Sequence, residues 1–164
     1  MNFQKGTAFY SILLGGFIAG TIDIGAASVI NLLTPTSILH SIASGLLGKD
    51  SFSGGAATAA IGLLLQWAMS LIIAAIYVSV MSQLPELRKR WVFSGVIAGV
   101  IIFFVMNYLV LPLSAAPFRP KLGLQEFITR FHGPDKFLEN MLAMILFGLF
   151  VAFFAKDMRT ARAD

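Results

Sequence analysis

The stretch WVFSGVIAGVIIFFVMNYLVLPL, residues 91–113, is long enough and apolar enough to decide the class of fold. It contains no Asp, Glu, Lys or Arg, and it directly follows a basic run at residues 88–90. A bilayer core about 30 Å thick needs roughly 20 helical residues to cross it. Trp91 at its start is an aromatic residue of the kind that marks the membrane interface. We therefore expect a transmembrane helix from Trp91 to Leu113.

Three further stretches have the same character. They run from about Thr7 to Leu33, from about Ser53 to Leu84 and from about Phe137 to Ala155. Over all 164 residues, 57% are hydrophobic and 12% are charged, against about 25% charged residues in ordinary soluble domains. The sequence thus predicts an all-α, polytopic membrane protein in which residues 1–164 form a single membrane domain with four transmembrane helices.

Two of the connections between these stretches are amphipathic. From Pro35 to Leu47 the apolar residues share one helical face, with His40 and three serines largely opposite. This pattern predicts a short helix that either lies at the membrane interface or re-enters the bilayer. From Lys121 to Phe131 a similar pattern predicts a helix lying flat on the membrane surface.

Basic residues indicate the orientation of the four-span arrangement. Seven Lys and Arg residues fall in the N-terminus, the second connection and the C-terminal tail, and five fall in the first and third connections. Because cytoplasmic segments carry an excess of these residues, both termini are expected in the cytoplasm. The two amphipathic connections would then lie on the outer face.

Small residues recur where helices could approach closely. Gly16 with Gly20, and Gly95 with Gly99, form two GxxxG motifs. In lipid, helices associate partly through such close backbone contacts. We favour packing within one bundle, and the alternative is contact with a partner protein or a second copy of the chain.

Six polar residues form a candidate cluster in the outer half of the membrane: Asp23, His40, Gln66, Asn107, Glu139 and Asn140. Asp23 is the most informative of them, since an acid within a membrane helix costs about 3 kcal/mol unless it faces protein or water. One hypothesis is an outward-facing cavity that binds a ligand, ion or proton at Asp23. The other, which we favour, is a hydrogen-bond network that fixes helix register around Asp23, whose ionisation the sequence leaves open.

Several classes of function have no support in the sequence. Cysteine is absent, which excludes disulfides and thiolate chemistry, and the charges are too dispersed for nucleic-acid binding. No metal-binding, cofactor-binding or catalytic motif is found. We therefore name no catalytic residue, no metal ligand and no cofactor, and we do not expect an enzyme. An enzyme acting on a lipid or quinone would need reactive side chains, for instance His40 and Glu139, to face one another.

Four motifs resemble a family of bacterial four-helix inner-membrane proteins loosely called YagU-like. They are GGFIAGTIDI, SILHSIASGLLG, SGGAATAAIGLLLQW and FVMNYLVLPLSAAP, which touch the first three spans and their outer connections. The resemblance implies a bacterial inner (plasma) membrane location, with Asp23 and Asn107 matching the family pattern. Relatives often carry histidines where this chain has Gln66 and near Ala143, so a histidine-based role is not implied here. No activity is established for the family, although an association with acid resistance has been suggested.

These observations lead to two expected functions. The first is a non-enzymatic structural or accessory protein of the inner membrane, embedded in the lipid bilayer and in contact with a membrane-protein partner or a second copy. The alternative is a small transporter or proton-linked permeation protein with an outer-half polar cavity around Asp23.

Overall fold

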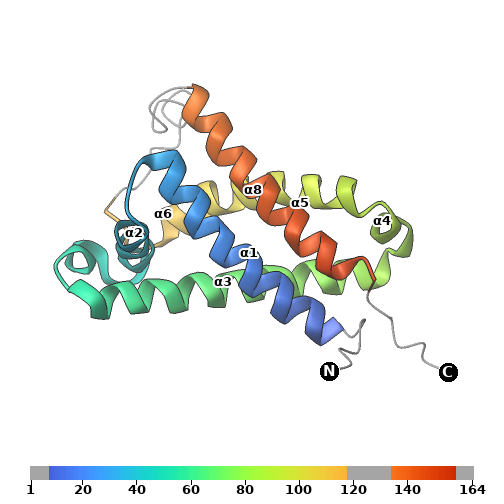
Figure 1. The fold of residues 1–164 in the computed structure, drawn as a ribbon, viewed down its shortest axis with the longest axis horizontal. Helices are drawn as coiled ribbons and strands as arrows, with labels where there is room; N and C mark the ends of the chain where they lie inside the picture. Colours follow the sequence, from blue (N-terminus) through green and yellow to red (C-terminus); the bar gives the residue numbers. More distant parts are fainter. Residues whose placement is uncertain (1–7, 118–133, 158–164) are drawn as a thin grey trace.

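The computed structural model of the chain describes residues 8–117 and 134–157, and within these ranges it is helical without a strand (Figure 1). Four helices are long and apolar enough to cross a membrane. They are α1 (Ala8–Asn31), α3 (Gly55–Gln83), the rod Trp91–Leu113 and α8 (Pro134–Ala155). The predicted all-α fold with four spans is confirmed. The surface helix predicted at Lys121–Phe131 lies outside the described residues.

The first connection forms the predicted helix, α2 (Pro35–Leu47). Its start follows from local chemistry, because the Thr34 side chain accepts a hydrogen bond from the backbone N–H of Ser37 and Pro35 occupies the first turn. It ends at Gly48, whose φ of +63° suits glycine. The 3-10 turn η1 (Gly48–Phe52) then leads into α3.

The third span changes its helical geometry near its C-terminal end. It consists of α5 (Trp91–Val105), the π-helical turn η2 (Met106–Val110) and the short α6 (Leu111–Leu113). Pro112 lacks an N–H and its ring crowds the carbonyl one turn earlier, so a regular α-helix cannot continue through it. The wider π-helical turn, in which Leu111 donates to the Met106 carbonyl, accommodates this residue.

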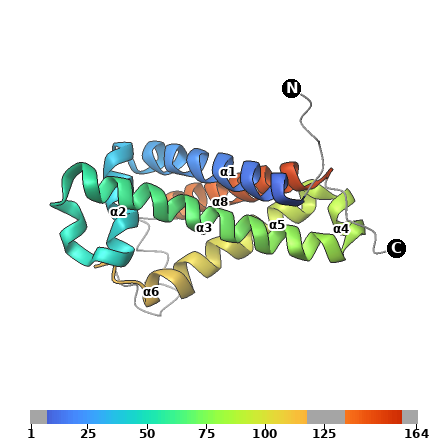
Figure 2. The ribbon, with the colours of Figure 1, turned by 90° about the horizontal axis from the view of Figure 1, so that it is seen from below.

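The spanning helices pack in the order α3, α1, α8, α5 (Figure 1). At one end, which also holds α4 (Pro85–Lys89), Ser11 Oγ donates to the Phe154 carbonyl at 2.8 Å, and the Trp91 and Phe153 rings meet edge to face. At the other end α2 runs across the spanning helices, and the α5–α6 rod moves away from α3 (Figure 2). The connection that contains α2 and the connection that contains α4 therefore lie at opposite ends of the molecule.

The core lies toward the α4 end and is small. Its fully apolar members come from three of the spans: Ala19, Ala74, Val78, Met81, Phe147, Val151, Ala152 and Ala155. Between 11% and 28% of the most apolar window of each span is buried inside the molecule. The remaining apolar surface points outward, as a chain whose solvent is lipid requires.

The glycines of α5 lie where it crosses α8. A Cβ atom added at Gly95 would stand 2.9 Å from the Cβ of Ala152, and one at Gly99 would stand 2.8 Å from the backbone nitrogen of Ile145. From the other side, a Cβ at Gly148 would stand 2.9 Å from the Gly99 Cα. The two helices therefore meet backbone to backbone at these positions.

Candidate functional site

Asp23 on α1 is joined to Gln66 on α3. Gln66 Nε2 lies 2.7 Å from Asp23 Oδ2 and 3.4 Å from the carbonyl oxygen of Gly20, one turn earlier on α1. Gln66 itself is buried. Because a carbonyl oxygen can only accept a hydrogen bond, the amide NH2 must face α1, and Asp23 Oδ2 is therefore an acceptor.

Small residues allow α1 and α3 to approach at this level. A Cβ at Gly20 would collide with the side chain of Ser70, and one at Gly16 would stand 3.0 Å from the Cα of Leu71. Ser70 is satisfied within its own helix, where Oγ donates to the Gln66 carbonyl at 2.8 Å. Trp67 of α3 adds two further contacts here: its Nε1 donates to Thr21 Oγ1 at 3.2 Å, and its ring meets that of Phe17 edge to face. Since lipid supplies no hydrophobic force between helices, the close approach, the carboxyl–amide bond and these Trp67 contacts attach α1 to α3 at this level.

Two shielded oxygens of α1 lack a partner. Asp23 Oδ1 and Ser28 Oγ are buried and have no hydrogen-bond partner among the described residues. A carboxylate charge on such an oxygen is costly in an apolar medium, and protonation removes that cost. Oδ1 is thus the atom at which a proton would sit, while Oδ2 keeps accepting from Gln66.

Two asparagines of the predicted cluster bond to their own helices. Asn107 Nδ2 donates to the Phe103 carbonyl at 2.8 Å, and Asn140 Nδ2 donates to the Lys136 carbonyl at 2.7 Å. Asn107 stands in the π-helical turn η2, so its amide supports a backbone carbonyl where the regular pattern changes. Among the described residues, neither asparagine forms a hydrogen bond with Asp23.

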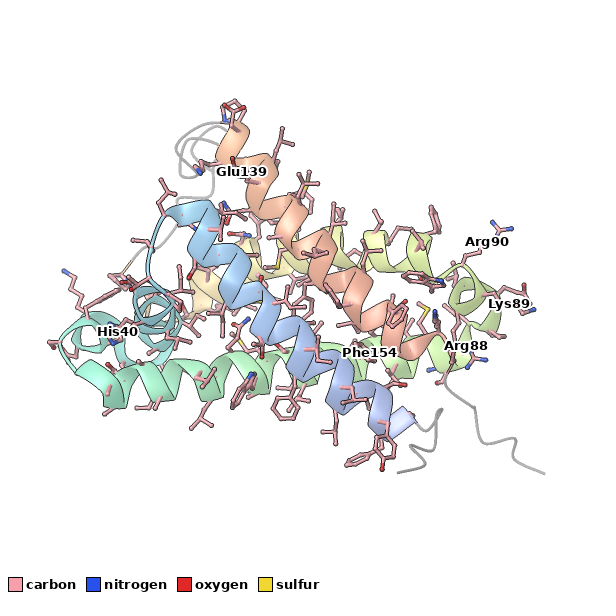
Figure 3. The ribbon with its side chains drawn as sticks, viewed as in Figure 1. His40, Arg88, Lys89, Arg90, Glu139 and Phe154 are labelled. Carbon is pink, nitrogen blue, oxygen red and sulfur yellow. The ribbon has the colours of Figure 1, made fainter. Side chains whose placement is uncertain are left out.

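His40 and Glu139 lie on different elements at the end of the molecule away from α4, and they are separate in Figure 3. His40 Nε2 lies 2.9 Å from the Gly55 carbonyl oxygen, near the start of α3. Glu139 Oε2 pairs with Lys136 Nζ one turn earlier on α8, at 2.7 Å. The facing pair that a lipid- or quinone-directed enzyme would need at these two residues is not formed. Of the six predicted residues, Asp23 and Gln66 are the two that the structure joins.

Other polar contacts between helices were not foreseen from the sequence. Lys136 Nζ donates to the Ile30 carbonyl at the end of α1. Near the α4 end, the Tyr77 hydroxyl lies 2.7 Å from Ser94 Oγ, and both residues are buried. The sequence feature that could have indicated the contact between Lys136 and Ile30 is a lysine at the start of the fourth span, at the same end as the end of the first span. For the contact between Tyr77 and Ser94, the sequence offers only two hydroxyl groups at similar depth along their helices.

Within residues 8–117 and 134–157, no group of three or more His, Cys, Asp or Glu side chains could hold a metal ion. Comparison of the chain with protein-family models, curated proteins and solved structures finds no match. Its own helix contacts, polar groups and charges are therefore the basis on which a function can be proposed.

Proposed function

We propose that the chain is a non-enzymatic structural or accessory protein of the bacterial inner membrane. The observation that carries this proposal is the bond between Asp23 and Gln66, which uses the acid to hold α1 against α3. The asparagines, Glu139 and His40 are engaged locally instead of converging on one site. The resemblance to YagU-like proteins supports the same location.

Charge supports an orientation with the α4 end in the cytoplasm. Four described Lys and Arg residues lie at that end: Arg88, Lys89, Arg90 and Lys156. Lys49 and Lys136 lie at the other end, where Lys136 is bound to a backbone carbonyl. α2 crosses α3 beside Gly62, where an added Cβ would collide with the Leu39 carbonyl oxygen, so the crossing lies inside α3 and not at its first residue. Reporter fusions after residues 50 and 87 would test this orientation, with an exported alkaline phosphatase active at the first and inactive at the second.

Both GxxxG faces would then serve helix packing within the chain. Gly95 and Gly99 face α8, and Gly16 and Gly20 face α3. A partner protein or a second copy would have to contact a different surface, because these four positions are already covered by the chain's own helices.

One observation favours a second candidate, a proton-linked permeation protein. The shielded Asp23 Oδ1 has no partner in the described part of the chain, and it is the group on α1 that can take up and release a proton. Such a protein would need Asp23 to ionise during its working cycle, whereas a structural pair needs only the hydrogen bond.

Asp23→Asn separates the two candidates, because asparagine preserves the shape and a hydrogen bond to Gln66 but cannot titrate. A deletion strain would be complemented with wild type, Asp23→Asn, or the matched control Asp50→Asn, which alters an exposed acid in η1. Growth would be compared across pH, salt and lipophilic stress at equal membrane abundance. The structural proposal expects full complementation by Asp23→Asn. A folded, abundant Asp23→Asn that fails while Asp50→Asn succeeds would establish the permeation candidate instead.

A further inference from the structure

A surface hollow at the α4 end of the molecule is lined by both basic and apolar residues. Its volume is about 570 Å³. It is lined by Lys89, Arg90, Trp91, Val92, Phe93 and Val96. Two cations thus stand at one edge, and the first turns of a membrane-spanning helix form the rest.

The apolar wall of this hollow faces away from the protein. Val92 and Phe93 are 51% and 56% exposed, and Val96 follows them on the same face of α5 one turn later. Trp91 forms the boundary between the two kinds of wall. Its ring is held by Phe153 at 5.7 Å and by the Lys156 ammonium, 5.2 Å from the ring centroid. The hollow therefore passes from a basic edge to a hydrocarbon-facing groove within a few residues.

The two cations at the edge of the hollow, Lys89 and Arg90, differ in how free they are to bind an anion. Lys89 forms an exposed ion pair with Glu86, with 2.7 Å between Nζ and Oε1. This hydrogen bond, together with the charges of Lys89 and Arg90, lowers the pKa of the Glu86 carboxyl, which is therefore ionised at neutral pH. Arg90 is exposed, and Figure 3 shows it extending from the α4 end of the molecule. Residues 86–90 still carry a net charge of +2, from three cations and one carboxylate.

We propose that this hollow binds an anionic phospholipid of the surrounding membrane, with the phosphate at Arg90 and Lys89 and an acyl chain along Val92, Phe93 and Val96. A zwitterionic lipid would bind more weakly, because the positive charge of its headgroup would be repelled by Lys89 and Arg90. A soluble anion would leave the apolar wall unused. An anionic lipid matches both parts of the hollow, and basic pockets beside transmembrane helices are suited to such headgroups.

The full-length protein in detergent micelles offers a direct test that does not depend on its orientation in a membrane. The chain has two tryptophans, so Trp67→Phe leaves Trp91 as the only one, positioned in the wall of the hollow. Quenching of its fluorescence would be titrated with bromine-labelled phosphatidylglycerol and phosphatidylcholine. We expect half-maximal quenching at a concentration at least about five-fold lower for phosphatidylglycerol, the factor that one interfacial cation supplies.

Variants separate this site from general attraction between charges. Lys89→Gln with Arg90→Gln should abolish the preference for phosphatidylglycerol. Arg88→Gln also removes a positive charge from the α4 end, but Arg88 does not line the hollow. This variant should therefore keep most of the preference for phosphatidylglycerol. Glu86→Gln releases Lys89 and should strengthen the preference.

Val96→Phe fills the groove without changing charge and should weaken quenching by both lipids, with circular dichroism confirming that each variant is folded. Equal quenching by the two lipids in the Trp67→Phe protein would overturn the proposal. A preference that survives loss of both Lys89 and Arg90 would do the same, as would displacement of phosphatidylglycerol by an excess of inorganic phosphate.

Discussion

Lys136 of α8 donates a hydrogen bond from Nζ to the carbonyl oxygen of Ile30 at a distance of 2.5 Å, which closes the C-terminal end of α1. The last carbonyls of a helix have no partner within it, and the helix dipole makes a cation favourable there. Together with the bond from Ser11 to the Phe154 carbonyl, this contact ties α1 to α8 at both ends.

Lys136→Met should therefore destabilise the protein by about 1 to 2 kcal/mol, because the change removes a charged hydrogen bond to the end of α1 but keeps the apolar stem. The matched control is Glu139→Gln, which breaks the half-exposed ion pair with Lys136 and leaves the contact to Ile30. Its effect should stay within about 0.5 kcal/mol. Unfolding by sodium dodecyl sulfate, followed by circular dichroism, would measure both. Equal losses for the two variants would contradict the assignment.

The carboxyl–amide bond predicts an energetic coupling between α1 and α3. Asp23→Ala leaves Gln66 without its 2.7 Å partner, and Gln66→Ala does the same to Asp23. A double-mutant cycle with the two changes should give a coupling energy of about 1 kcal/mol, in the range measured between membrane helices. The same unfolding assay supplies the four stabilities. A coupling near zero would mean that the bond contributes nothing to holding the helices together.

Much of the fold could be predicted because lipid imposes a simple rule on composition and length. The spans were placed within a few residues, and α2 was delimited by Pro35 and its amphipathic pattern. The ends are where the prediction was least accurate. The fourth span begins at Pro134 instead of Phe137, since proline is well placed in a first helical turn.

The site was harder to predict, because sequence gives the depth of a residue along a helix but not its direction around the axis. Asp23, Gln66 and Asn107 were all predicted in the same half of the membrane, yet only the first two are bonded to each other. In a soluble protein the apolar stripe shows which side of a helix is buried. Here both sides are apolar, so partners such as Lys136 and Ile30 depend on packing that only the structure reveals.

Leu32 offers a position where a smaller residue should increase stability. Its φ is +54°, and it closes α1 with a bond from the Leu33 N–H to the Ser28 carbonyl, a place that normally favours glycine. Leu32→Gly should stabilise the protein by about 1 kcal/mol by removing the strain of a side chain in the left-handed region. Leu33→Gly is the control, because Leu33 is the adjacent leucine without a positive φ, and it should be neutral or destabilising. A loss of stability in Leu32→Gly would show that its apolar surface matters more than its backbone.

The crossing of α5 and α8 predicts opposite results for the same substitution at two glycines. Gly99→Ala places a methyl group against the backbone of Ile145, which has no room for it, so the helices must separate. We expect a loss of about 1 to 3 kcal/mol, as for other overpacked contacts. Gly25→Ala adds the same methyl group on α1, where no described atom lies within 4 Å of the new Cβ, and it should stabilise the helix by about 0.5 kcal/mol. Thermal unfolding of both variants in one detergent provides the comparison. If Gly99→Ala were as stable as Gly25→Ala, α5 and α8 could not be in backbone contact, and the order of the helices in the membrane would have to differ from α3, α1, α8, α5.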